Sequence, residues 1–151
     1  MNMNKENILK SLRINYVVAF IATLIIIIAF ESGFVAKGAL TGIISSTAYY
    51  ILQVATVMLT VILIPTAIKS FTKAAERACD MNGNDALKLY AKKSMQRIAL
   101  LFAVIVINGF TYYGTGYEGA LYCGLFGYGA MIYSFPTRMV MEQFLQGKTD
   151  K

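Results

Sequence analysis

Six residues contain the spacing most closely associated with ligand chemistry. Residues 114–119 read GTGYEG, which places three glycines at the G-x-G-x-x-G spacing of dinucleotide-binding folds. In those folds the motif follows a buried strand and begins a helix, so that backbone amides and the helix N-terminus face a pyrophosphate. The meaning of the motif therefore depends on the elements at either side of it.

Few other residues offer chemistry. The chain has no His, which excludes a histidine-ligated metal site. Cys79 and Cys123 fall on opposite sides of the topology predicted below, so they are too far apart for an intramolecular disulfide. Acid–base and nucleophilic catalysis need paired groups with matched proton affinities, and no acid pair lies within an apolar run. We therefore expect no enzymatic activity and no cofactor.

The composition is that of a membrane protein. Of the 151 residues, 57% are hydrophobic and only 15% are charged, whereas charged residues make up about a quarter of an ordinary soluble domain. Each helical crossing of a bilayer needs about 20 mainly apolar residues. A bundle of four crossings would use nearly the whole chain and leave no room for a separate catalytic domain.

Four apolar runs are candidate crossings. The first, 14–34, follows basic residues as a signal peptide would, but no small-x-small cleavage site comes after it, so we expect an uncleaved anchor. The other three are 48–68, 95–113 and 119–135. The predicted fold is an all-α integral membrane protein, in which residues 1–151 form one antiparallel up-down bundle of four transmembrane helices.

The Lys and Arg residues are distributed unevenly around these runs. Three precede the first run, seven lie between the second and third, three follow the fourth, and the first connection has only Lys37. Cytoplasmic connections are the ones enriched in basic residues. Both termini are therefore expected in the cytoplasm, with the protein in the inner or plasma membrane. Because the net charge of +6 is divided among short segments rather than forming one basic face, nucleic acid is not an expected partner.

This topology gives the glycine motif an ordinary interpretation. It follows an apolar helix rather than a strand, and it lies on the outer face of the membrane. We expect its glycines to make a tight turn between two antiparallel helices, with the neighbouring tyrosines in the interfacial aromatic belt.

The segment 69–97 is predicted to be a cytoplasmic helical hairpin. Residues 80–85 (DMNGND) are a turn signal, in which Gly83 would end one helix and Asn84 or Asp85 would cap the next. Its basic residues either form a solvated face that sets topology or contact anionic lipid headgroups or an acidic partner. These residues are Lys69, Lys73, Arg77, Lys92, Lys93 and Arg97.

Polar side chains within the runs are rare and fall at a similar depth near the outer surface. They are Glu31, Gln53, Asn108 and Tyr122. One interpretation is that they line a shallow outward-facing pocket. The other is that Gln53 and Asn108 form hydrogen bonds between helices and serve packing alone.

The fourth run is rich in small residues. Gly119, Cys123 and Gly127 recur at four-residue steps, a spacing that lets helix backbones approach closely, either within the chain or in another copy. Cys123 is expected to be a packing residue rather than a reactive thiol. Pro136 would end this run, and the following residues would form a short amphipathic helix on the inner membrane surface.

Two functions are compatible with these features. The first is a small non-enzymatic interaction, accessory or assembly subunit, whose partners would be the bilayer, anionic lipid headgroups, and a second copy or another membrane subunit. The alternative is a minimal oligomeric transporter or channel that passes a small solute through the outward-facing pocket.

Overall fold

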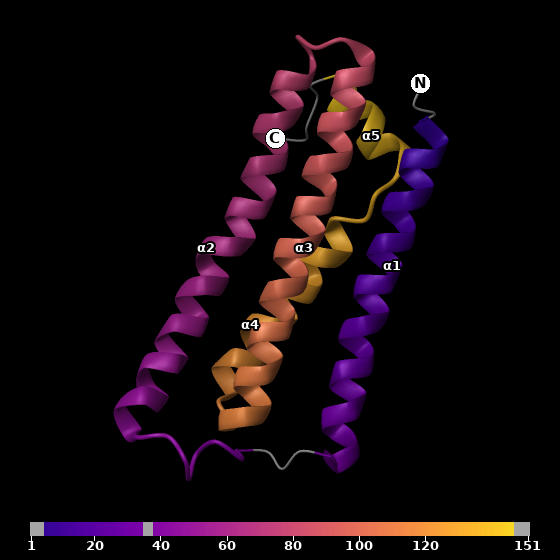
Figure 1. Cartoon of the computed structure of the whole chain (residues 1–151). Helices are drawn as coiled ribbons and strands as arrows, with labels where there is room; N and C mark the ends of the chain where they lie inside the picture. The colour runs from indigo at the N-terminus through magenta and orange to yellow at the C-terminus, as the bar shows by residue number, and fades with distance from the viewer. Residues whose placement is uncertain (1–4, 35–37, 147–151) are drawn as a thin grey trace.

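The regular elements of the chain are helices. In the computed structural model, which describes residues 5–34 and 38–146, no strand is found within those ranges (Figure 1). The elements in order are α1 (Lys5–Ala29), a short π-helical turn η1 (Phe30–Phe34), α2 (Ser46–Ala78), α3 (Gly83–Thr115), α4 (Glu118–Tyr133) and α5 (Arg138–Leu145).

Three helices are long and apolar enough to cross a membrane, which indicates an integral membrane protein. They cover Lys5–Gly33, Ser46–Ala78 and Gly83–Thr115. At 33 residues each, α2 and α3 would be about 50 Å long, well beyond the roughly 30 Å of a bilayer's hydrocarbon core. The helical part of the hairpin predicted for residues 69–97 is therefore confirmed, because both helices continue for several turns past the apolar region.

The fourth predicted crossing, 119–135, corresponds to α4, which has 16 residues. A helix of that size is about 24 Å long, which is shorter than the roughly 30 Å hydrocarbon thickness. Helix length alone therefore supports three crossings.

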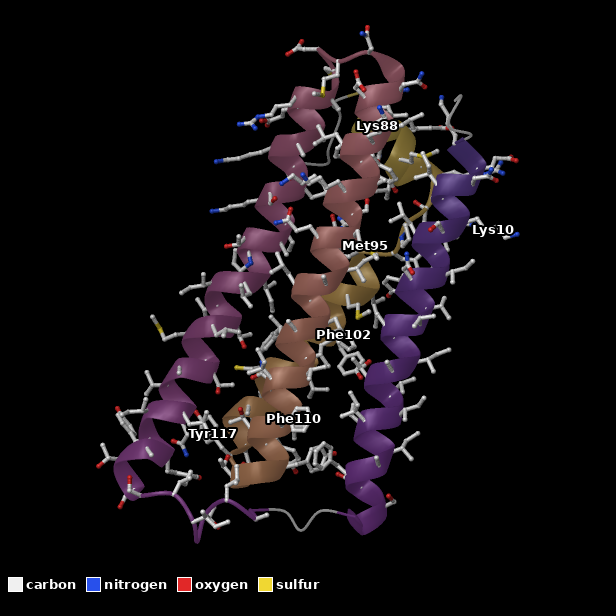
Figure 2. All side chains as sticks on the ribbon, in the orientation of Figure 1. Lys10, Lys88, Met95, Phe102, Phe110 and Tyr117 are labelled. Atoms are coloured by element: carbon white, nitrogen blue, oxygen red, sulfur yellow. The ribbon has the colours of Figure 1, made fainter. Side chains whose placement is uncertain are left out.

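The ends of the molecule differ in character. The start of α1, the turn between α2 and α3, and α5 all lie at one end, which we call the head (residues 5–13, 69–97 and 138–145; Figure 1). Figure 2 shows the labelled Lys10 and Lys88 in the head, whereas Phe102, Phe110 and Tyr117 lie in the other half.

The head has its own hydrophobic core, to which α1, α2, α3 and α5 all contribute. Its buried residues are Leu12, Phe71, Ala74, Ala75, Ala78, Ala86, Leu87, Tyr90, Met141 and Phe144. The alanines let α2 and α3 approach closely. The ring of Phe144 fills the space beside them, with its centroid 5.0 Å from that of Phe71 and 5.2 Å from that of Tyr90.

The head core corrects the expectation that residues after Pro136 form a helix on the membrane surface. Phe144 is fully buried and Met141 is 4% exposed. The apolar face of α5 is therefore buried against α2 and α3, because those helices extend far enough beyond the apolar region to cover it.

The turn between α2 and α3 also differs from the prediction. The N-cap of α3 is Asn82 rather than Asn84 or Asp85, and Gly83 begins α3 instead of ending α2. The carbonyl of Asn82 accepts hydrogen bonds from the N–H groups of Asp85 and Ala86. Asp85 then lies in the first turn, where a negative charge interacts favourably with the helix dipole.

The opposite end of the molecule contains the glycine motif, and the predicted turn is confirmed. Gly116 caps α3 with φ 70°, a left-handed conformation that favours glycine, and its N–H donates to the carbonyl of Tyr112. The N–H groups of Gly38 and Leu40 donate to the carbonyls of Tyr113 and Gly114, both at 2.9 Å. The end of α3 is therefore closed by hydrogen bonds to its own cap and to the preceding connection.

Candidate functional site

A row of buried polar side chains joins α2 to α3. Asn108 Nδ2 donates to Thr60 Oγ1 and to the carbonyl of Val104, both at 2.8 Å. One turn farther along, Thr56 Oγ1 and Thr111 Oγ1 are hydrogen-bonded at 3.2 Å. Asn108 itself is fully buried. These contacts support the interpretation of Asn108 as a hydrogen-bonding residue between helices.

The other three predicted pocket residues lie apart from it. Glu31 is exposed and accepts a hydrogen bond from the hydroxyl of Tyr113 at 2.9 Å. Gln53 is half-buried on α2, and Tyr122 on α4 is 59% exposed. The described residues that line the cavity beside Asn108 do not include Glu31, Gln53 or Tyr122. The structure therefore does not bring the four side chains around one pocket.

The cavity beside Asn108 lies between α1, α3 and α4. Its volume is about 90 Å³. Isoleucines and leucines make up much of its wall, and the polar groups around it come from Thr23, Asn108 and three tyrosines, among them Tyr128. The cavity is therefore small and mainly apolar.

The small residues of α4 face α3 of the same chain. A Cβ added to Gly127 would lie 3.1 Å from Ile105 Cγ1, and one added to Gly124 would lie 3.6 Å from Asn108 Cβ. Ala120, one turn before Gly124, is fully buried. The positions in contact are thus one i, i+4, i+7 face of a helix.

This face corrects the predicted stripe in part. Gly127 belongs to it, but Gly119 and Cys123 are only half-buried, and a Cβ added to Gly119 would meet the ring of Tyr117 instead of another helix. A strict four-residue step drifts around an α-helix of 3.6 residues per turn, so Gly119 and Cys123 lie beside the contact face rather than on it.

Arg97 is a buried cation, contrary to the expectation that it faces solvent or lipid headgroups. Only 7% of it is exposed. One of its terminal guanidinium nitrogens donates to the carbonyl of Ser134 at 2.9 Å, and its Cζ lies 4.0 Å from the centroid of the Phe71 ring. Arg97 therefore interacts with the C-cap of α4, where a positive charge is favourable.

Two side chains of α1 donate hydrogen bonds to backbone carbonyls near the end of α4. The hydroxyl of Tyr16 donates to the carbonyl of Met131 at 3.0 Å, and Arg13 Nε donates to that of Pro136 at 3.1 Å. We call Arg13, Tyr16 and Arg97 the carbonyl clamp. Met131 and Ser134 belong to the last turn and C-cap of α4, and Pro136 lies in the linker after it. These donors therefore bind carbonyls at the point where the chain leaves α4.

The remaining basic residues of the predicted set divide into two groups. Lys69, Lys73, Arg77 and Lys93 line an open groove of about 370 Å³ between α2 and α3, which we call the basic groove. Lys92 is exposed on α3 but lies outside this groove.

The part of the chain that the structure describes contains free thiols but no cluster of metal-ligating side chains. Within residues 5–34 and 38–146, no three His, Cys, Asp or Glu side chains are grouped so that they could hold a metal ion. Cys79 is exposed in the head, Cys123 is half-buried in α4, and both thiols are free.

Comparisons with protein families, curated proteins and solved structures find no match to this chain. Its function is therefore inferred from its own residues. The arrangement as a whole consists of an apolar bundle, a separately packed head, a carbonyl clamp that joins the two, and a basic groove at their boundary.

Proposed function

We propose that the chain is a non-enzymatic accessory subunit of the inner or plasma membrane. In this proposal four crossings hold the head at the cytoplasmic surface, where it is a docking platform for another membrane subunit. The observation that supports it most directly is the packed head core, to which α1, α2, α3 and α5 all contribute. A segment that served only to connect two crossings would not need such a core.

The head is coupled firmly to the bundle, as a docking platform requires. Both α2 and α3 run without interruption from the apolar half into the head. The clamp residues Arg13 and Arg97 bind the linker between α4 and α5 from two different helices. The head is therefore joined to the bundle by two continuous helices, α2 and α3, and by the contacts of the carbonyl clamp.

A fourth crossing is supported by the charges that flank α4. Between Glu118 and Arg138 the chain carries no charged residue. The side chains of Leu125, Phe126 and Ile132 are 58%, 72% and 62% exposed, as expected for a lipid-facing surface. Non-helical backbone near a membrane needs partners within the protein, and the clamp provides them for the linker. We infer that α4 and this linker cross together.

Cysteine labelling tests the fourth crossing. In a chain with Cys79→Ser and Cys123→Ser, Glu118→Cys and Met139→Cys would be made separately, because both positions are exposed. A membrane-impermeant maleimide should reach the two positions from opposite sides of the membrane. Labelling of both from the same side would show that α4 does not cross.

Native mass spectrometry of the full chain in mild detergent tests the accessory role. We expect a second membrane polypeptide to copurify at a fixed ratio. Phe144→Ala removes a fully buried ring of the head core and should release that polypeptide while the chain stays in the membrane, whereas Phe126→Ala, at a 72% exposed position on α4, should not. A chain that is monomeric at all protein concentrations, or a partner retained by both variants, would contradict the proposal.

A further inference from the structure

We propose that the basic groove is a binding site for the phosphate of an anionic phospholipid in the leaflet next to the head. The site requires only that α2 and α3 lie in a membrane. It is therefore independent of the accessory role, and either proposal can fail while the other holds.

The groove brings cations from two helices together. Lys69, Lys73 and Arg77 follow one another at four-residue steps along α2, and Lys93 of α3 lies across from them. Thr66 and Ser70 add hydroxyl groups to the wall. Residues four apart share one face of a helix, so the α2 cations are directed to the same side.

No carboxylate of the described chain pairs directly with these cations. Lys69, Lys73 and Arg77 are exposed and have no ion pair with any described residue. Lys93 donates to Ser70 Oγ at 3.2 Å and to Gln96 Oε1 at 3.1 Å, which are both neutral. No carboxylate is among the described residues that line the groove. A groove of this charge and hydrogen-bonding capacity is suited to a phosphate group.

The position of the groove favours a lipid over a free anion. Of the residues that line the groove, Thr66 lies nearest the apolar half of α2, close to the end of its apolar run. Below it the exposed surface of α2 is apolar, with Val61 62% and Ile62 56% exposed. A phospholipid with its phosphate in the groove could lay its acyl chains along this surface. Inorganic phosphate would gain nothing from it.

A comparison of Lys92 with Lys93 distinguishes a defined binding site from a diffuse positive surface. They are adjacent on α3 and carry the same charge, but only Lys93 lines the groove. A diffuse field would depend on both residues about equally. A site would depend on Lys93 alone.

The test is a titration of the full chain, purified in a zwitterionic detergent, with short-chain phosphatidylglycerol. The controls are short-chain phosphatidylcholine and inorganic phosphate. We expect saturable binding of phosphatidylglycerol that weakens about fivefold in Lys73→Gln and in Lys93→Gln, the effect of one lost charge near an anionic membrane surface. Lys92→Gln should bind like the parent chain. Thermal unfolding of each variant checks that it is folded.

Three results would overturn the proposal. Equal weakening by Lys92→Gln and Lys93→Gln would show a diffuse field. Binding of inorganic phosphate as tight as that of phosphatidylglycerol would show a soluble-anion site. Equal binding of phosphatidylcholine would show that the acyl chains alone are recognised.

Discussion

Individual polar residues in this chain are placed where backbone or side-chain groups need a partner. Arg97 is buried and binds a helix-terminal carbonyl, and Asn108 is buried and joins α2 to α3. Both contacts join separate helices. A change at either residue should therefore appear in stability, and its size should follow from the contacts that are lost.

Replacing Asn108 with Leu is expected to lower the free energy of unfolding by about 1 kcal/mol, the upper part of the range for hydrogen bonds between membrane helices. In a chain of 151 residues, that corresponds to a Tm lower by about 2–4 °C. Thermal unfolding in one detergent measures it, with Gln53→Leu as the control, because the side chain of Gln53 is half-buried and forms no hydrogen bond with the described residues.

The cause can be checked with a double-mutant cycle. Combining Asn108→Leu with Thr60→Val should cost about 0.6 kcal/mol less than the sum of the single changes, because both remove the same hydrogen bond. Strictly additive effects would mean that this hydrogen bond contributes nothing.

Arg97→Lys keeps the positive charge but loses the planar group that lies over Phe71. We expect a loss of about 2 kcal/mol, within the range for hydrogen bonds to charged groups and for desolvated cation–π contacts. The measured quantity is again Tm, which should fall by about 4–8 °C. The control is the reverse exchange at an exposed position, Lys92→Arg, which should change the Tm little. If Arg97→Lys has the same Tm as the parent chain, the geometry of the guanidinium group is unimportant for stability.

At the scale of elements, α4 is the helix whose behaviour depends most on its neighbours. It is the shortest of the helices that run along the bundle, and its C-terminal end is held by donors from α1 and α3. Its small residues bring it against α3. Its position is therefore set by close packing on one side and by the carbonyl clamp at one end.

Two glycines of α4 give a matched test of this packing. Gly127→Leu places a side chain against Ile105 and Val104, whose Cγ1 atoms would lie 3.1 and 3.2 Å from the new Cβ. Overpacking of this kind costs about 1–3 kcal/mol. A Cβ added to Gly129 would meet no atom within 4 Å, so Gly129→Leu should be neutral or slightly stabilising, because Leu favours a helix by nearly 1 kcal/mol over Gly. Equal thermal stability of the two variants would show that α4 does not pack on α3 through Gly127.

At the scale of the whole molecule, polarity divides the chain into two parts. The start of α1, the α2–α3 turn and α5 share one end, as Figure 1 shows, and the eleven Lys and Arg residues that the structure describes all lie within the head. This clustering supports the orientation proposed above, with the head in the cytoplasm.

The exposed native Cys79 reports this orientation directly. In a chain with Cys123→Ser, an impermeant maleimide is expected to label Cys79 in inverted membrane vesicles and not in intact cells. Cys79→Ser with Cys123 retained is the control, because Cys123 is half-buried in α4 and should react slowly from either side. Labelling of Cys79 in intact cells would invert the proposed orientation without altering the fold.

Much of the fold follows from local patterns in the sequence. Apolar runs predicted long apolar helices, three of which are long enough to cross a membrane, and helical periodicity on both sides of residue 83 predicted that α2 and α3 extend to the turn between them. The glycine motif was correctly predicted as a turn, because an apolar helix precedes it. These predictions succeeded because each depends on residues within a few turns of one another.

The tertiary structure alone decided the contacts between distant segments. Arg97 binds a residue 37 positions away, and Arg13 binds one 123 positions away. The same is true of α5, whose amphipathic pattern suits a membrane surface and a protein core equally well. Likewise, Lys93 differs from Lys92 only because α2 passes beside one of them. The spacing of hydrophobic and charged residues indicates which faces of a helix will be buried. Which surface buries each face is determined by the packing of the whole chain.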